Sequence, residues 1–321
     1  MRKPAGTGIV QVASLTKRYR NGGGVSDISL SVPAGSITGF VGVNGAGKST
    51  TLRCIVGLLQ PDAGRIALFG GPASAEARRR IGFLPEERGL FSSERARDAI
   101  AFHGRLKGMT KRGAFASADA LLERIGLGAQ GRARIGTLSK GNMQRVQLLC
   151  ALVHDPKLLL LDEPLSGLDP MGQTELLSLF AEFRSKGGAI LFSSHAMAAV
   201  ENICDRVIVL SGGQVVYEGS TADAATRAPH GVIVVTADAA GLAAAASRIG
   251  GEVRILSAGS DTARYQVRLP LHVTHPVLMR ALADHAVPIL DFRPIKQDLE
   301  GAFWALSRDE PAAKRRESLA A

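Results

Sequence analysis

Residues 42–49 read G-V-N-G-A-G-K-S, a glycine-rich segment that ends in Lys-Ser. An apolar run at residues 37–43 leads into it, as in a buried strand, and apolar residues recur at helical spacing from Ser49 onward. A turn between such a strand and such a helix directs successive backbone N–H groups to the positive end of the helix, where phosphate oxygens bind. The pattern predicts a phosphate-binding loop in an α/β fold. A glycine-rich turn with a chance Lys-Ser is the alternative.

The residue types within this loop indicate which groups bind which part of a nucleotide. Three glycines, Gly42, Gly45 and Gly47, allow the tight turn, and Lys48 supplies a mobile positive charge for the β- and γ-phosphates. The hydroxyl of Ser49 is an expected ligand of Mg²⁺. The expected nucleotide-binding residues of this segment are Gly42, Asn44, Gly45, Ala46, Gly47, Lys48, Ser49 and Thr50.

Two acidic residues, Asp162 and Glu163, come directly after the apolar run at residues 158–161. Side chains at the carboxyl end of a parallel strand emerge at the ligand crevice of the sheet. We therefore expect Asp162 to hold Mg²⁺ through its water shell and Glu163 to polarise an attacking water; an acidic pair that caps a helix is the alternative. His195 follows the next apolar strand and is expected to hydrogen-bond a γ-phosphate, unless it is an ordinary surface or core histidine.

Sequence patterns outside this core predict further subdomains and a second domain. Residues 9–15 and 28–32 alternate around a glycine-rich turn, which predicts an antiparallel β subdomain, and a helical lobe is expected at about residues 90–155. The nucleotide-binding domain is predicted to span residues 1–221. An alanine-rich linker (222–230), a small α+β domain of order βαββαβ (231–307, with its last strand at 287–292) and a disordered tail (308–321) are predicted to follow it. The order βαββαβ is compatible with a ferredoxin-like fold.

Charge and cysteine content narrow the function classes. The net charge of +10 is compatible with nucleic acid or an anionic membrane, but the basic residues are mostly dispersed and only 5% of residues are aromatic, so no nucleic-acid partner is expected. Three well-separated cysteines suggest neither disulfides nor zinc and favour the cytosol. The N-terminus lacks the apolar core of a signal peptide, and the longest uncharged stretch is too polar to span a membrane. Any path through a membrane is therefore expected in another chain.

A second motif gives the chain a family resemblance. Residues 138–145 read L-S-K-G-N-M-Q-R, about ninety residues after the phosphate loop. With that loop and the Asp162-Glu163 pair, they resemble the nucleotide-binding subunit of an ATP-binding cassette (ABC) transporter over about two thirds of the chain. The resemblance implies a P-loop cassette fold with a mixed sheet core, an antiparallel β subdomain and a helical lobe.

The resemblance also implies roles for further residues. Tyr19 occupies the position at which the family stacks an aromatic ring on adenine, although an ordinary strand-end tyrosine remains the alternative. Ser139, Gly141 and Asn142 belong to the signature segment, which faces the γ-phosphate held by the opposite subunit. Asp169 lies in the loop that communicates across the dimer, and His195 takes the position of the switch histidine.

Two departures from the family pattern concern the signature and the metal site. Lys140 and Asn142 replace a glycine and a glutamine, and Glu86 replaces a glutamine that senses Mg²⁺. A carboxylate still ligates Mg²⁺, so Glu86 is an expected metal ligand together with Ser49 and Asp162. These variants and the pattern at residues 298–303 resemble a bacterial branch of sodium- and drug-efflux ATPases.

By this resemblance the chain is expected to be an ATPase that forms a homodimer around two ATP molecules and drives export through a separate transmembrane permease. It would lie in the cytoplasm, peripheral to the inner face of the membrane. A soluble ABC-type ATPase with a regulatory role is the alternative, although neither a second cassette nor a long coiled coil is present. A GTPase would need an Asn-Lys-x-Asp motif, which the sequence lacks. A regulatory role of the C-terminal domain stays open.

Overall fold

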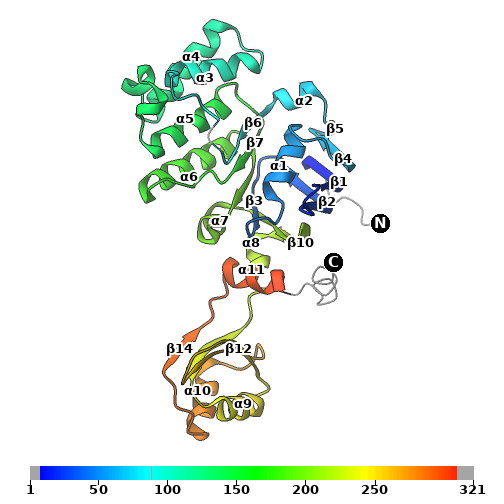
Figure 1. Ribbon diagram of the computed structural model, residues 1–321, viewed down its shortest axis with the longest axis vertical. Coiled ribbons are helices and arrows are strands. Elements are labelled where there is room, and N and C mark those ends of the chain that lie inside the picture. The colour runs from blue at the N-terminus through cyan, green and yellow to red at the C-terminus, as the bar shows by residue number, and fades with distance from the viewer. Residues whose placement is uncertain (1–7, 88, 309–321) are drawn as a thin grey trace. The chain divides into compact units, whose positions relative to one another are not determined.

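The computed structural model describes residues 8–87 and 89–308. The chain divides into two compact units, Met1–Thr221 and Ala222–Ala321 (Figure 1). Of the tail expected at residues 308–321, Arg308 ends a helix and the remainder lies outside the described residues. No helix within the described ranges is long and apolar enough to cross a membrane.

The first unit contains an antiparallel sheet with the strand order β2-β1-β4-β5. Its strands are β1 (Gly8–Arg18), β2 (Gly24–Pro33), β4 (Ala63–Leu68) and β5 (Gly71–Pro72). Alternate side chains of β1, among them Val10 and Val12, are buried because successive residues of a strand point to opposite faces. This sheet is the antiparallel β subdomain that the sequence predicts.

A six-stranded sheet with the order β10-β9-β3-β8-β7-β6 forms the centre of the unit. Its strands are β3 (Ile37–Gly42), β6 (Ile81–Leu84), β7 (Leu158–Asp162), β8 (Ala189–Ser194), β9 (Arg206–Ser211) and β10 (Gln214–Ser220). All neighbours pair in parallel except β9 and β10. Every residue of β3, β7 and β8 is buried, as expected for strands covered on both faces. Their carboxyl ends therefore meet at one edge of the sheet.

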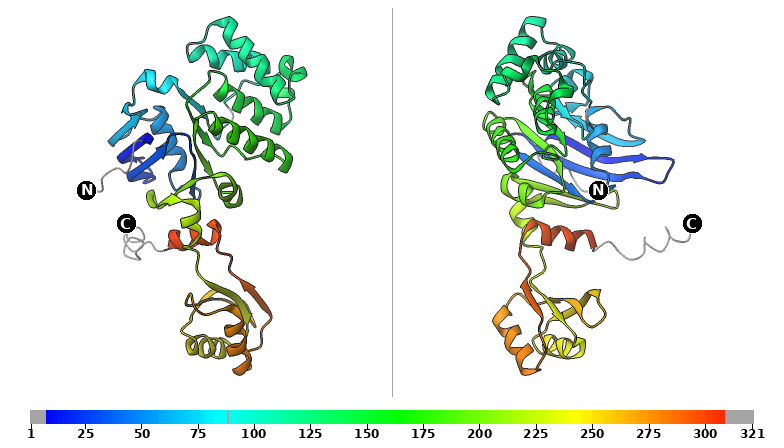
Figure 2. Two further views of the ribbon diagram at one scale, coloured as in Figure 1. Left: turned by 180° about the vertical axis from the view of Figure 1, so that it is seen from behind. Right: turned by 60° about the vertical axis from the view of Figure 1, so that its left-hand side comes forward.

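Helices of the first unit cover the sheet and form the helical lobe. They are α1 (Lys48–Val56), α2 (Ala75–Arg79), α3 (Ala96–Leu106), α4 (Lys111–Arg124), α5 (Lys140–Leu152), α6 (Pro170–Ser185) and α7 (Met197–Ile203), with 3₁₀ turns at Ala129–Arg132 and Ile135–Thr137. Figure 2 shows α3, α4 and α5 gathered as one lobe beside the central sheet. Their buried faces share an apolar cluster that includes Ile100, Leu122 and Leu149.

The second unit holds a four-stranded antiparallel sheet with the order β12-β13-β11-β14. Its elements are β11 (Gly231–Thr236), α9 (Ala239–Arg248), β12 (Glu252–Ala258), β13 (Ala263–Arg268), α10 (His275–Asp284), β14 (Asp291–Pro294) and α11 (Leu299–Arg308). Residues of α9, α10 and the sheet form one apolar core.

Two boundaries differ from the prediction. A strand is predicted at residues 287–292, but β14 begins at Asp291, because Ala286 takes a positive φ of 51° and the chain turns before it pairs with β11. Val287 packs into the core from this loop. The alanine-rich segment expected as a linker starts with a short helix, α8 (Thr221–Ala225), since alanine favours helix.

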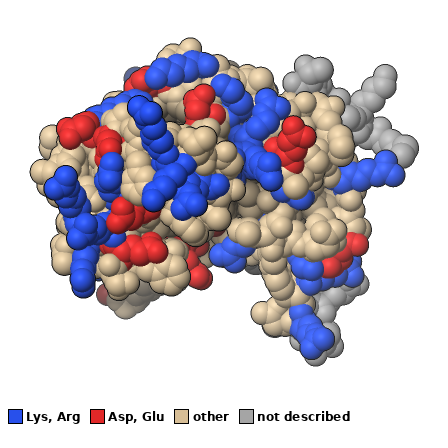
Figure 3. Space-filling model, turned by 90° about the horizontal axis from the view of Figure 1, so that it is seen from above, with Lys and Arg blue, Asp and Glu red and all other residues tan. Residues whose placement is uncertain are grey.

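The surface carries many basic side chains without a single continuous patch on the face that Figure 3 shows. Lys and Arg side chains are spread over this face, and Asp and Glu side chains lie between them.

Candidate active site

The phosphate loop connects β3 to α1, and its backbone requires glycine at two positions. Gly45 has a φ of 82° and Gly47 a φ of 101°, both in the region that other residues rarely adopt. A Cβ at Gly47 would also lie only 2.2 Å from Cγ1 of Val25. The buried side chain of Lys48 folds back over the loop, where Nζ donates to the carbonyl oxygens of Gly42 at 2.7 Å and Val43 at 3.4 Å. These two bonds hold the Lys48 amine over the loop.

A cavity of about 380 Å³ opens beside this loop. It is lined by Gly24, Asn44, Gly45, Ala46, Gly47, Lys48, Ser49, Thr50, Glu86, Asp162 and Glu163. The structure therefore brings the phosphate loop together with all three residues that the sequence predicts as metal ligands, Ser49, Glu86 and Asp162. Carboxylate and hydroxyl oxygens are the ligands that Mg²⁺ prefers.

Asp162 is buried, and within the described ranges only one of its two carboxylate oxygens is paired. Oδ1 accepts a 2.6 Å hydrogen bond from the Ser193 hydroxyl. Oδ2 is also buried and has no hydrogen-bond partner among the described residues. A buried carboxylate oxygen without a partner is costly unless a cation or water satisfies it. The donor set beside the phosphate loop therefore fits a hydrated Mg²⁺ ion.

Glu163 takes a strained backbone conformation that turns its carboxylate toward His195. Its φ is 50°, uncommon for a residue other than glycine, and its N–H donates to the Ser193 hydroxyl oxygen at 2.8 Å. Oε2 lies 2.9 Å from Nδ1 of His195. The Glu163 side chain is 10% exposed and that of His195 69% exposed. The exposed His195 thus orients the carboxylate of Glu163 at the wall of the cavity.

Tyr19 follows the end of β1 and contacts the phosphate loop. Its hydroxyl lies 3.4 Å from Oγ1 of Thr50, and its side chain is partly exposed. This contact places an aromatic side chain next to the loop, where the base of a bound nucleotide could stack.

The signature residues and Asp169 do not line this cavity. Ser139 caps α5, and its hydroxyl oxygen accepts from the N–H of Asn142 at 3.2 Å. Asp169 caps α6, and its Oδ1 accepts from the N–H of Gly172 at 2.8 Å. Ser139 is exposed and Gly141 is half-buried. The predicted site residues therefore form two groups, one at the cavity and one at the start of α5 and α6.

Three contributors were missed by the sequence reasoning. Gly24 lines the cavity, and Ser193 orients both acidic residues. Gln147 donates to the backbone on both sides of Glu86. Only Ser193 had a signal in the sequence, its place at the end of the strand before His195.

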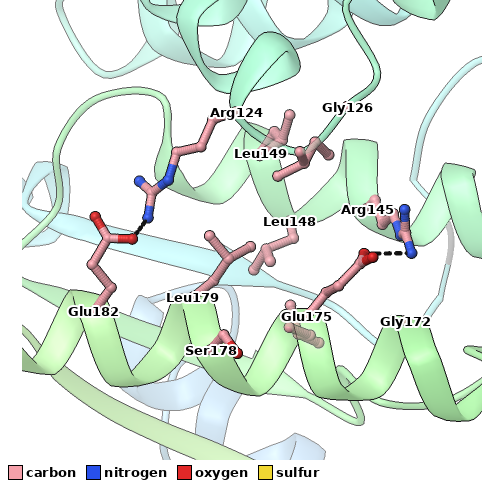
Figure 4. Close-up of a pocket in the computed structure, with 12 residues that line it drawn as sticks. Arg124, Gly126, Arg145, Leu148, Leu149, Gly172, Glu175, Ser178, Leu179 and Glu182 are labelled. Atoms are coloured by element: carbon pink, nitrogen blue, oxygen red, sulfur yellow. Dashed lines mark hydrogen bonds and ion pairs between the residues drawn. The ribbon is translucent and has the colours of Figure 1, made fainter.

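A larger pocket of about 530 Å³ lies elsewhere in the unit, between α4, α5 and α6 (Figure 4). Leucines of α5 and α6, such as Leu148 and Leu179, point into it, and two ion pairs, Arg124–Glu182 and Arg145–Glu175, bridge the helices. None of its lining residues is one that the sequence predicts for the nucleotide site.

Comparison with known proteins agrees with this geometry. The model of the family described as ABC transporter matches residues 25–166. An uncharacterized ABC transporter ATP-binding protein of Bacillus subtilis, YhaQ, is 39% identical over 211 residues, which are 66% of this chain and 71% of that protein. The Nod factor export ATP-binding protein I of Burkholderia lata is 36% identical over 227 residues, 70% of this chain and 72% of that protein.

A solved structure of an ABC transporter subunit is also similar to this chain. The structure of cbiO1 from Clostridium perfringens, described as part of the ABC transporter complex cbiONQ, has a TM-score of 0.58 and 31% identity to this chain. The match covers 66% of this chain and 88% of that one. The resemblance, the cassette fold and the ATP-binding function that the sequence predicts are confirmed. The chain belongs to the ABC transporter family, as an ATP-binding subunit and an ATPase.

Proposed function

We propose that two copies of this chain close around two ATP molecules and that hydrolysis reopens the pair to drive export through a separate membrane subunit. The division of the site into two groups carries this proposal. The phosphate loop, Asp162 and Glu163 share a cavity that Ser139 does not line, and Ser139 is exposed at the N-terminus of α5. An exposed helix N-terminus favours an anion, so Ser139 and Gly141 of one copy would face the γ-phosphate held by the other.

Mg²⁺ would be held by Ser49, Asp162 and Glu86. The buried, unpartnered Oδ2 of Asp162 supports this assignment within the described part of the chain. When bound, the ion would neutralise charge on the β- and γ-phosphates. Lys48 supplies a second positive charge at the same place, so the loop tolerates a nucleotide with several negative charges.

Glu163 would act on the attacking water. Its carboxylate accepts a hydrogen bond from the water and takes up the proton as the water oxygen bonds to the γ-phosphorus. The bond between that phosphorus and the β–γ bridging oxygen breaks, and ADP and inorganic phosphate leave. His195, 2.9 Å from the carboxylate, would keep Glu163 in this orientation and reach the γ-phosphate from the solvent side.

An exposed apolar surface of the helical lobe favours a membrane partner. Phe102 and Leu106 lie one turn apart on α3 and are 51% and 62% exposed. Large apolar side chains exposed together mark interaction sites. A permease that contacts this surface would hold the chain at the cytoplasmic face of the membrane. The relative named for Nod factor export supports export as the direction.

The test compares wild type with Glu163→Gln by ATP turnover and by light-scattering mass, with and without ATP. We expect the wild type to hydrolyse ATP and Glu163→Gln not to do so. The mass of Glu163→Gln should double when ATP is added, because unhydrolysed ATP stays between the two subunits. Glu76→Gln removes an exposed carboxylate of α2 and should behave as wild type. A Glu163→Gln variant that binds ATP and stays monomeric contradicts the proposed dimer.

A further inference from the structure

Helix α5 carries two buried glutamines, Gln144 and Gln147, on one side. They lie three residues apart and therefore project in similar directions from the helix. Gln144 is 7% exposed and Gln147 5% exposed. A buried amide must find hydrogen-bond partners, so the partners of these two side chains reveal what α5 holds in place.

Gln147 binds the loop that presents Glu86. Its Nε2 donates to the carbonyl oxygen of Pro85 at 3.2 Å and to that of Glu87 at 3.2 Å. These two carbonyls flank Glu86, whose side chain lines the nucleotide cavity. The side-chain amide of Gln147 therefore donates both of its hydrogen bonds to the backbone around a single cavity residue.

We propose that Gln147 is a positioning residue that holds Glu86 at the nucleotide cavity and thereby sets how strongly Mg²⁺ tightens ATP binding. The inference rests on the proposed function, in which Glu86 is a Mg²⁺ ligand. Glu86 has left β6, which ends at Leu84, so the ladder of that sheet does not orient it. The two bonds from Gln147 instead hold the backbone on both sides of Glu86.

Two further contacts of α5 do not involve this loop. Gln144 donates to the carbonyl oxygen of Pro164 at 3.3 Å, directly after Glu163. Arg145 pairs with Glu175 of α6 at 2.6 Å, on the side of α5 that Figure 4 shows. One helix thus contacts the backbone beside Glu86 and beside Glu163.

The experiment measures binding of a fluorescent ATP analogue in a Glu163→Gln background, with and without Mg²⁺. The readout is the Kd without Mg²⁺ divided by the Kd with Mg²⁺. Gln147→Met keeps the length of the side chain and removes both donors. We expect this ratio to fall about three- to tenfold, the size of one or two neutral hydrogen bonds, while the Kd without Mg²⁺ stays the same.

A matched control and a double variant test whether the change in the Kd ratio arises through the Glu86 loop. Gln144→Met makes the same substitution on the same side of α5 but leaves the Glu86 loop alone, so the ratio should not change. Adding Gln147→Met to Glu86→Ala should lower the ratio no further, because Gln147 acts through Glu86. An unchanged ratio in Gln147→Met, an equal loss in Gln144→Met, or an additive loss in the double variant overturns the inference.

Different results would contradict the role of Gln147 and the proposed role of Glu86. If Glu86→Ala alone leaves the ratio unchanged, Glu86 is no metal ligand and that part of the proposed function fails. If Glu86→Ala lowers the ratio and Gln147→Met does not, only the inference fails. Thermal melting verifies the fold of each variant, and Gln147→Leu, also without a donor, replaces Gln147→Met if the latter does not fold.

Discussion

The Ser193 hydroxyl donates a 2.6 Å hydrogen bond to Oδ1 of Asp162. The hydroxyl oxygen of Ser193 also accepts a hydrogen bond from the N–H of Glu163 at 2.8 Å, so one side chain of β8 orients both acidic residues at the end of β7. The bond leaves Oδ2 of Asp162 turned away from Ser193 and without a partner in the described chain. Ser193 thus fixes which carboxylate oxygen would be free for the proposed Mg²⁺ ion.

Ser193→Ala should destabilise the protein and slow ATP turnover. Removing the hydroxyl leaves Oδ1 of Asp162 and the N–H of Glu163 buried without a partner, at a cost of about 1–3 kcal/mol for each group. Urea denaturation measures the loss. Ser178→Ala is the control, since that exposed hydroxyl bonds a backbone carbonyl of its own helix. Equal stability of the two variants would contradict the proposed role of Ser193.

Lys48→Ala should lose nucleotide binding while the fold persists. The amine lies over the loop at 2.7 Å from the Gly42 carbonyl, where it would meet the phosphates. Charge-assisted hydrogen bonds contribute about 1.5–3 kcal/mol, so we expect at least a tenfold weaker Kd for ATP by calorimetry. Lys157→Ala removes an exposed lysine and should bind as wild type. Unchanged affinity in Lys48→Ala would refute the loop assignment.

Tyr19→Ala should weaken ATP binding and Tyr19→Phe should not. The ring, rather than the hydroxyl, is expected to stack on adenine, and stacking of a base on an aromatic side chain contributes about 1–3 kcal/mol. The hydroxyl makes only a long contact of 3.4 Å with Thr50. Titrations with ATP and with inorganic triphosphate separate the two parts of the ligand. A similar loss for both ligands would show that Tyr19 acts on the loop and not on the base.

His154→Gln should flatten the dependence of stability on pH. Burial lowers the pKa of His154 to about 4, and the nearby Lys107 cation acts in the same direction. Between the ordinary pKa of 6.5 and about 4, the unfolded chain binds a proton that the folded chain excludes. The resulting stabilisation is complete above pH 6.5 and is lost as the pH falls toward 4.

Glutamine does not titrate and still donates to the carbonyl of Ile81, which His154 contacts at 3.2 Å. The free energy of unfolding, measured by urea denaturation across this pH window, should therefore decline less steeply in the variant than in the wild type. Parallel pH profiles would show that other groups govern the acid response.

Short-range patterns allowed most of the cassette core to be predicted. The apolar run at residues 158–161 lies in β7, and the alternation at residues 9–15 lies in β1, because burial on two faces or on one face leaves different periods in the sequence. The first and last residues of a helix or strand are harder to predict from the sequence than its presence. The strand predicted at residues 287–292 was placed too early, because the turn at Ala286 depends on packing that the sequence pattern does not display.

The sequence by itself determined which residues make up most of the candidate site, since the glycines, Lys48 and the Asp162-Glu163 pair lie at the ends of strands that local patterns predict. Tertiary structure alone decided which distant groups meet. Ser193 reaches Asp162 because β7 and β8 are neighbours in that register, and Gln147 reaches the Glu86 loop across about sixty residues. Such pairings depend on strand order and helix packing, whose energies are summed over many contacts and leave no local signal in the sequence.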